Sequence, residues 1–219
     1  AVAPLADGVE MQFRGLIFQD HRTLRFAGAD SSSEGQDASI RIVSRGLWQV
    51  DALAYVQARN FTNVVISATS LRKTLDQRNT PSTGLGGKIE IRPPVGSDHQ
   101  LRIGADARLS DGMLFEDAYS AVTGLVTARR NAGGNTATFG IFAENDWNIG
   151  ALTLTGGLRA DRWTIDNGFF AERSANGTVV RDDKFANRAG WQTSARIGAL
   201  YAARDGFAFR AAAYTGFRL

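Results

Sequence analysis

The feature of this sequence that most constrains its fold is a long alternation of apolar and polar residues. Over Leu101–Leu109 the odd positions are Leu, Ile, Ala, Ala and Leu, whereas the even positions are Arg, Gly, Asp and Arg. Successive side chains of a β-strand point to opposite faces, so this pattern predicts a strand with one apolar and one polar face. The same split recurs over residues 10–17, 48–59, 191–202 and 207–219.

These alternating segments are long. They run for roughly 9 to 15 residues, whereas strands of soluble proteins average about 5 or 6 and a tilted strand that crosses a bilayer needs about 9–11. No stretch of the chain approaches the ~18 consecutive apolar residues of a membrane helix. Abundant glycine (24) and scarce proline (4) favour strands and turns. The sequence therefore predicts an all-β fold, an antiparallel up-and-down transmembrane β-barrel segment of about ten strands.

Turn signals predict where these strands begin and how they are connected. The predicted strands begin near residues 9, 21, 37, 47, 84, 99, 136, 151, 187 and 206. Short turns are predicted at 19–20, 44–46, 95–98, 148–150 and 204–206, and long polar loops at 29–37, 61–83, 110–135 and 165–187. Outer-membrane barrels have short periplasmic turns and long extracellular loops. Within the last loop, Asn176-Gly177 predicts a type I′ hairpin that projects above the membrane.

The two faces of the predicted strands have different expected surroundings. The polar face would line the lumen, where charged residues pair or contact water; it includes Arg14, Arg102, Asp106, Arg108, Glu144, Asp146, Arg159, Asp161, Arg196 and Arg210. The apolar face would contact outer-membrane lipid. Aromatic residues near strand ends would form the interfacial girdles of such barrels. These residues are Trp48, Trp147, Trp163, Trp191 and Tyr201.

The composition offers little for catalysis or cofactor binding. Cysteine is absent, which excludes disulfides, thiol catalysis and cysteine-based metal sites. Both histidines, His21 and His99, are predicted on the short-turn side, away from other ligands or acid–base partners. Glu144 and Asp146 share one face, but lumen polarity is the simpler interpretation. Arginines are interleaved with apolar residues rather than clustered, so a nucleic-acid partner is not expected. We predict a protein that is no enzyme and holds no cofactor.

Several segments resemble one family. The sequence FAENDW at Phe142–Trp147, followed by LTLTGGLRADRW at Leu152–Trp163, resembles a barrel hairpin of TonB-dependent receptors. There, a strand ending in a FAEDxW-like sequence turns into an LTxGLRxD strand. The closing Ala213–Leu219 is similar to the strand that leads into a P-x-L-x-E-L loop in these receptors. The resemblance covers most of residues 84–219 and, more loosely, the N-terminal hairpins.

This resemblance implies an outer-membrane receptor of Gram-negative bacteria that takes up an iron–siderophore, haem or cobalamin-type ligand. Family members carry an N-terminal plug that contacts TonB, inside a 22-stranded barrel. Residues 1–219 would be a partial barrel without signal peptide or plug, and we expect this piece alone not to transport. Candidate ligand contacts in the loops are Arg78, Arg129, Arg130, Phe169 and Phe170. The alternative is a small self-contained barrel with a porin-like or structural role.

Overall fold

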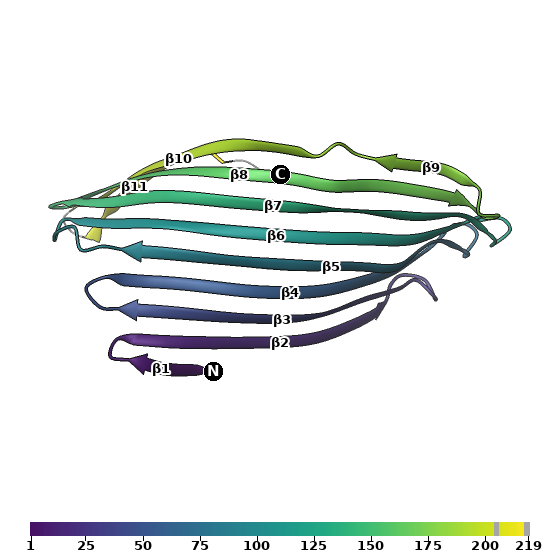
Figure 1. The fold of residues 1–219 in the computed structure, drawn as a ribbon, viewed down its shortest axis with the longest axis horizontal. Helices are drawn as coiled ribbons and strands as arrows, with labels where there is room; N and C mark the ends of the chain where they lie inside the picture. The colour runs from purple at the N-terminus through teal and green to yellow at the C-terminus, as the bar shows by residue number, and fades with distance from the viewer. Residues whose placement is uncertain (204–205, 217–219) are drawn as a thin grey trace.

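The computed structural model describes residues 1–203 and 206–216, and these form one antiparallel sheet of eleven strands. The strands are β1 (Val2–Ala6), β2 (Val9–Thr23), β3 (Asp30–Arg45), β4 (Gln49–Ile66), β5 (Lys73–Arg92), β6 (His99–Tyr119), β7 (Val126–Ile149), β8 (Leu152–Ser174), β9 (Val179–Lys184), β10 (Arg188–Ala202) and β11 (Ala208–Tyr214). Each strand pairs with the next in sequence, with one exception: β10 pairs with β8 instead of β9, and β9 pairs with β8 alone (Figure 1). The predicted all-β, up-and-down fold class is confirmed. The described residues contain no helix that could cross a membrane.

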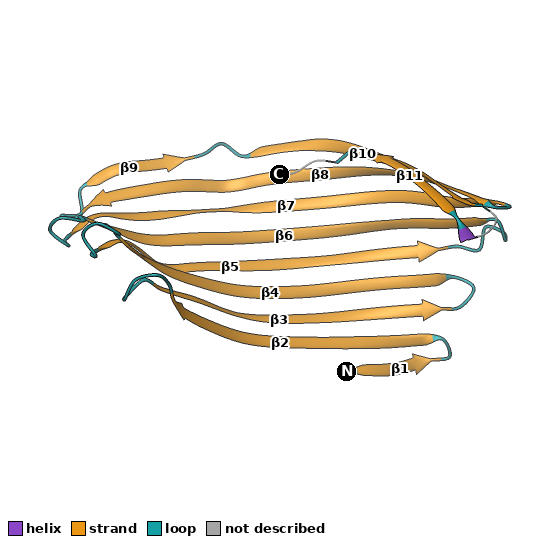
Figure 2. Ribbon diagram, turned by 180° about the vertical axis from the view of Figure 1, so that it is seen from behind, coloured by secondary structure: helices purple, strands orange, loops and turns teal. Residues whose placement is uncertain are grey.

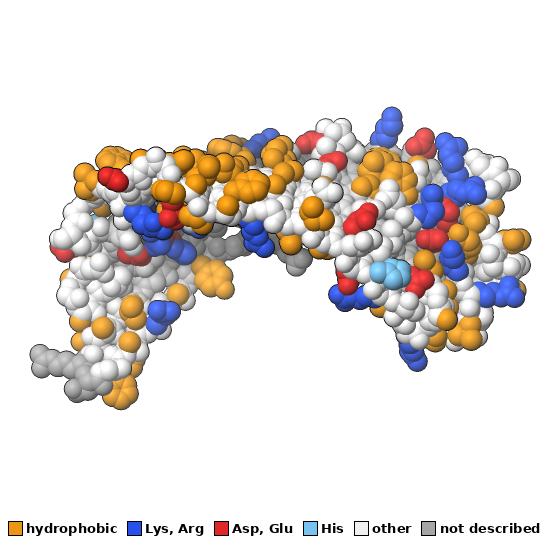
Figure 3. All heavy atoms as spheres, turned by 90° about the horizontal axis from the view of Figure 1, so that it is seen from below, with side chains coloured by type: hydrophobic (Ala, Val, Ile, Leu, Met, Phe, Trp, Pro, Cys, Tyr) orange, Lys and Arg blue, Asp and Glu red, His pale blue; other side chains and the backbone are white. Residues whose placement is uncertain are grey.

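The sheet is curved and open. Its strands lie side by side from β1 to β10, and β11 curls behind β8 (Figures 1 and 2). Among the described residues β1 and β11 do not pair with each other, so the sheet does not close into a barrel by itself. Seen from the β1 edge, with the strands running across the view, it has an arched outline (Figure 3).

The convex face of this arch carries an apolar band. Large apolar side chains on it are mostly exposed, among them Ile17 at 80%, Leu158 at 70% and Ile197 at 68%. Only two apolar side chains of the described residues, Ala29 and Ala128, are buried. A soluble sandwich would bury its apolar face between two sheets, so this sheet has no core of that kind. An apolar convex band fits contact with lipid.

The band spans one part of each strand, and the strands continue beyond it. On β6 the outward side chains are apolar from Leu101 to Leu109, and the next outward residue is Asp111. On β2 they are apolar up to Ile17, and Gln19 follows. A strand of about 9–11 residues crosses a bilayer, so β4 to β8, with 18 to 24 residues each, project well beyond the band at one end.

Most of the residues predicted to form long loops belong to the strand extensions instead. Residues 29–37, 61–83, 110–135 and 165–187 lie largely within strands, and the connections at that end are 24–29, 67–72, 120–125 and the hairpin tip 175–178. The predicted turn at 19–20 is wrong, because both residues lie inside β2, and no strand begins near residue 21. Beyond the band polar residues such as Gln19 and Asp111 interrupt the apolar convex side chains, so the regular alternation that marks a strand is lost while backbone pairing continues.

Three of the predicted short turns lie within two residues of connections in the structure. Connections at 46–48, 93–98 and 150–151 join strands at one end of the sheet. A further turn at Asp7-Gly8 joins β1 to β2 and was not predicted. Of the turn predicted at 204–206, Arg204 and Asp205 lie outside the described residues, as do Phe217–Leu219 at the end of the last predicted strand.

The Asn176-Gly177 hairpin exists, but its turn is not type I′. A type I′ turn needs positive φ at both central residues. Gly177 has φ of 88°, whereas Asn176 does not have a positive φ. The Gly177 N–H donates to Ser174 O (2.9 Å) and the Ser174 N–H donates to Thr178 O (2.9 Å). This is the three-residue loop in which a type I turn is followed by a left-handed glycine.

One glycine of the concave face has no room for a side chain. A Cβ at Gly104 would lie 2.4 Å from Phe142 Cζ and 2.6 Å from the backbone oxygen of Ile89. We expect Gly104→Ala to lower the free energy of unfolding by about 1–3 kcal/mol through overpacking. The measurement is urea unfolding of the detergent-purified protein that carries this chain.

The matched control is Gly156→Ala, since nothing lies within 4 Å of a Cβ at Gly156. If the two variants lost equal stability, the close approach of the Phe142 ring and of the Ile89 backbone oxygen to Gly104 would be contradicted.

Candidate functional site: the concave face

The concave face collects the polar residues of the alternating strands. Strand register places directly paired residues on one face, and cross-strand pairs such as Lys88 with Asp106 and Arg102 with Glu144 connect β5, β6 and β7. All ten residues predicted for the lumen lie on this face by the same register. It is hollowed near the short turns, where a hollow of about 870 Å³ is lined by residues of β5, β6, β7, β8, β10 and β11.

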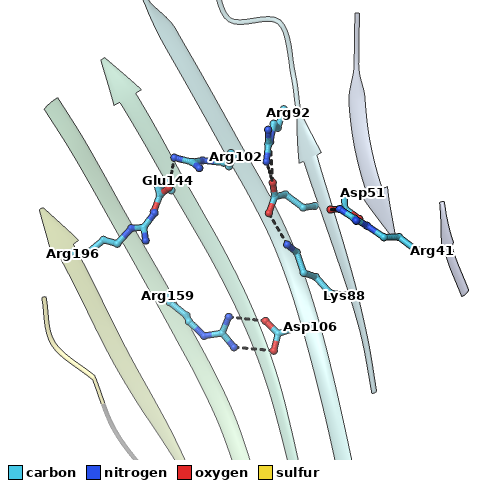
Figure 4. Close-up of polar contacts among 10 residues, drawn as sticks. Arg41, Asp51, Lys88, Arg92, Arg102, Asp106, Glu144, Arg159 and Arg196 are labelled. Atoms are coloured by element: carbon cyan, nitrogen blue, oxygen red, sulfur yellow. Dashed lines mark hydrogen bonds and ion pairs between the residues drawn. The ribbon is translucent and has the colours of Figure 1, made fainter. Parts of the chain in front are cut away.

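Arg159 on β8 is the centre of one ion network on this face (Figure 4). Its guanidinium donates to both oxygens of Asp106 on β6, at 2.6 and 3.0 Å, and to Asp161 Oδ1 at 2.5 Å. Asp161 is 1% exposed, the most buried carboxylate among the described residues. Gly140 on β7 lies under this contact, and a Cβ there would come 2.0 Å from Arg159 Nη2. The absence of a side chain at Gly140 thus leaves room for the Arg159 guanidinium.

A second network surrounds Glu144 on β7. Arg102 and Arg196 both contact this carboxylate (Figure 4). Arg102 also contacts Asp146 at 2.6 Å. Further towards the N-terminal strands, Lys88 and Arg92 flank Glu90 at 2.9 and 2.7 Å, and Arg41 pairs with Asp51 at 2.6 Å. Buried carboxylates of this face are therefore matched by cations from their own or neighbouring strands, as burial of charge requires.

A β-bulge decides which residues of β8 face inward near the loops. Asp166 pairs with Asn135 and Phe169 pairs with Gly133, so β8 has one residue more than β7 between these pairs. Asn167 there has a positive φ of 55°. Bulges of this kind re-aim side chains. On the loop side of the bulge, the even-numbered residues of β8, including Phe170 and Glu172, point to the concave face.

The bulge separates the five predicted ligand contacts into two groups. Arg130 and Phe170 lie on the concave face. Arg129 and Phe169 lie on the convex face, because each is the sequence neighbour of an inward residue in a regular strand. Arg78, at a bulge of β5, reaches Asp117 of the same convex face at 3.2 Å. The structure therefore brings only two of the five residues to the inner side.

Arg130 and Phe170 belong to a loop-side cluster that the sequence did not reveal. Arg130 bridges Glu116 on β6 and Glu172 on β8, at 3.0 Å each. The hydrogen bond to Glu116, which is 8% exposed, and then that to Glu172 raise the pKa of the Arg130 guanidinium. On β9, Arg181 pairs with Asp183 and lies 4.7 Å from the centre of the Phe170 ring. This cluster offers both charge and an aromatic face to a ligand.

The predicted girdle residues also separate into two groups. Trp48, Trp147, Trp191 and Tyr201 are exposed at 58, 45, 66 and 49%, and Trp191 and Tyr201 stand ten positions apart along β10. Trp163 differs, because it pairs with Thr138 and Gly190 in the middle of β8, on the concave face. Its indole covers Gly190, whose Cβ would lie 2.7 Å from Trp163 Cζ2. The strand-end position predicted for Trp163 is therefore wrong.

The family model for TonB-dependent receptor-like β-barrels matches residues 12–219. The chain belongs to the TonB-dependent receptor family. This confirms the resemblance seen in the sequence, and members of the family are outer-membrane proteins of Gram-negative bacteria. No curated protein sequence gives a significant match to the chain.

Solved structures share the fold of this receptor chain. The ferric yersiniabactin uptake receptor FyuA from Yersinia pestis aligns with a TM-score of 0.72 at 11% identity, covering 90% of this chain and 33% of its own. The ferric-catecholate import receptor Fiu from E. coli K12 has a TM-score of 0.67 at 14% identity, covering 93% and 44%. The ferric citrate transporter FecA has a TM-score of 0.65 at 12% identity, covering 95% and 33%. The chain thus spans less than half of each solved receptor.

The receptor family consists of transporters and not of enzymes, in agreement with the prediction from sequence. His99 lies at the short-turn end as expected, where it stacks on Trp147 at 5.6 Å and contacts Asn145. His21 does not, because β2 continues to Thr23 and carries it to the loop side. Among residues 1–203 and 206–216 no group of His, Cys, Asp or Glu is arranged to hold a metal ion.

The Arg159 network gives a prediction on stability. Arg159→Met leaves Asp106 and Asp161 facing each other without a cation, and we expect a loss of about 3–5 kcal/mol in the free energy of unfolding. Arg22→Ala is the control, because Arg22 is 70% exposed and its pair with Asp20 contributes less than about 1 kcal/mol. Denaturant unfolding in detergent measures both. Similar small losses would show that Arg159 does not stabilise the sheet.

The four tryptophans give a prediction on orientation. In single-tryptophan variants reconstituted in bilayers, brominated acyl chains should quench the fluorescence of Trp147 and Trp191 strongly. Trp163 should be quenched several-fold less, because it faces the concave side and the lipid cannot reach it. Stronger quenching of Trp163 than of Trp191 would mean that the assignment of the two faces is reversed.

Proposed function

We propose that this chain forms part of the barrel wall and the extracellular loops of a receptor that takes up a scarce ligand with energy from TonB. The ligand class is an iron–siderophore, haem or cobalamin-type molecule. The observation that carries the proposal is the loop-side cluster of Arg130, Phe170, Glu116 and Glu172, which lies on the concave face beyond the apolar band. The relatives named as uptake receptors for ferric complexes support the choice of ligand class.

We propose the outer membrane as the site of this protein. The convex band of exposed apolar residues would contact its lipid, and Trp191 and Tyr201 would mark the two interfaces on β10. The strand extensions would then stand above the membrane, with the loop-side cluster on the inner wall of the extracellular part.

The proposal assigns residues 1–219 to a partial barrel domain. The free edges of β1 and β11 would leave backbone groups unpaired in lipid, which costs several kcal/mol for each group. Further strands would complete the barrel, and a plug and TonB would act with it. The piece described here would not transport alone.

Uptake by living cells tests the proposal. The gene that carries this chain should support uptake of a radio-iron-labelled siderophore or haem, or of labelled cobalamin, and its deletion should abolish that uptake. Loss of TonB should have the same effect as the deletion. Uptake that persists without TonB would favour the alternative, a passive porin-like barrel.

Neighbouring residues on opposite faces provide matched variants for ligand binding. We expect Phe170→Ala and Arg130→Gln each to weaken ligand affinity about tenfold or more, as loss of a buried aromatic or arginine contact commonly does. Arg129→Gln and Phe169→Ala should change the affinity less than about twofold, since both side chains face outward. Whole-cell ligand binding measures all four. Equal effects on the two faces would exclude the loop-side cluster as the ligand contact.

A further inference from the structure

Arg162 of β8 departs from the pattern of the apolar band. It pairs with Phe139 on β7 and with Trp191 on β10, so it lies on the convex face. A polar row that includes Asp111 and Asp166 ends the band on the loop side. In the described strands between this row and the short turns, Arg162 is the only Lys, Arg, Asp or Glu on the convex face.

No carboxylate of the described residues neutralises this arginine. The convex positions that surround it hold only alanine, threonine, isoleucine, phenylalanine and tryptophan. On its own strand and face the nearest carboxylate is Asp166, four residues away and about 13 Å along the strand. Arg162 accordingly forms no ion pair within the described ranges. A charge on a lipid-facing surface is unfavourable, so Arg162 requires an anion from outside the sheet.

Two backbone carbonyls orient the guanidinium and leave one of its edges free. Nη1 of Arg162 donates to Gly190 O at 3.2 Å and to Trp163 O at 3.4 Å. Its Nε and Nη2 donate to no acceptor among the described residues. These two nitrogens form an edge of the planar fork that can donate to two oxygens of one phosphate. The free edge of Arg162 is therefore suited to a single oxyanion.

The neighbours of Arg162 indicate what carries this oxyanion. Phe139 is 50% exposed and Trp191 is 66% exposed, and both lie beside Arg162 on the convex face. Tryptophan is enriched at the headgroup level of membranes. Arginine near such a boundary covers apolar surface with its stem and brings its head to the polar layer. A free anion gains nothing from the apolar neighbours, whereas a lipid places its phosphate at the guanidinium and its acyl chains against the rings.

We infer that Arg162 and Trp191 form a binding site for the phosphate headgroup of a lipid in the outer leaflet of the membrane. The assignment to this leaflet rests on the proposed function, which puts the strand extensions outside the cell. The Nε–Nη2 edge of Arg162 holds two phosphate oxygens, and Phe139 and Trp191 contact the acyl chains. Because these residues lie on the convex face, this lipid site is separate from the ligand contacts Arg130 and Phe170.

Native mass spectrometry of the full-length receptor tests the inference. The delipidated protein in detergent is titrated with phosphatidic acid, and separately with diacylglycerol, which has the same acyl chains without phosphate. We expect Arg162→Gln to weaken the binding of one phosphatidic acid molecule about tenfold, as loss of a hydrogen bond between charged groups commonly does. Binding of diacylglycerol should not change. Arg162→Lys keeps the charge without the two-donor edge, so its loss should be smaller than that of Arg162→Gln.

Arg14→Gln is the matched control, because Arg14 is an exposed arginine of the concave face that forms no ion pair with the described carboxylates. It should bind phosphatidic acid as the wild type does. An excess of inorganic phosphate should not displace the lipid. Equal losses in Arg14→Gln and Arg162→Gln, unchanged binding in Arg162→Gln, or displacement by inorganic phosphate would overturn the inference.

Fluorescence quenching in bilayers locates the bound lipid. In full-length variants with a single tryptophan, brominated phosphatidic acid should quench Trp191 several-fold more than the same fraction of brominated phosphatidylcholine does. Trp147, at the opposite end of the band, should show no such preference. This comparison keeps Arg162, so it remains decisive if Arg162→Gln does not fold, and an equal preference at both tryptophans would contradict the lipid site. Neither measurement depends on uptake, so a failure of lipid binding and a failure of transport can be told apart.

Discussion

Backbone hydrogen bonding between neighbouring strands is the constraint on which the rest of this structure depends. In lipid no water replaces a missing partner, so a spanning sheet must pair every strand on both sides. The ladder from β1 to β11 meets this requirement everywhere except at its two edges. Because the pairing fixes the register, it also fixes the two faces: apolar residues on the convex side and charged residues on the concave side. Barrel wall and loop-side cluster both follow from this arrangement.

The concave face shows how a sheet holds many charges close together. Carboxylates such as Asp161 and Glu144 are nearly inaccessible to water, yet each is contacted by arginine from its own or a neighbouring strand. Glycine makes this possible, since Gly140 leaves space for the Arg159 guanidinium and Gly104 leaves space for the Phe142 ring. Charge pairing on this face therefore depends on small residues that leave room for the larger side chains.

The sequence predicted the membrane-spanning part of the fold well. Alternation identified the segments around residues 48–59, 101–109 and 191–202, and the resemblance to TonB-dependent receptors is confirmed by the family model. It failed beyond the apolar band, where β2 continues past residue 20 and four predicted loops are strands. There polar residues interrupt the apolar convex side chains, so the alternation ends, whereas backbone pairing continues. The bulge at Asn167 was also missed, and with it the inward orientation of Phe170 and Glu172.

By itself the sequence determined that the chain is a membrane-type antiparallel sheet, with an arginine-rich face opposite an apolar one, because period-two alternation is a local property of each strand. It also placed all ten polar residues on the inner face. Only the tertiary structure decided which charges meet, since Arg159 and Asp106 are 53 positions apart and come together through the register of three strands. The same register and its bulges decided that Arg130 and Phe170 face inward, that Arg129 and Phe169 face outward, and that Trp163 covers Gly190.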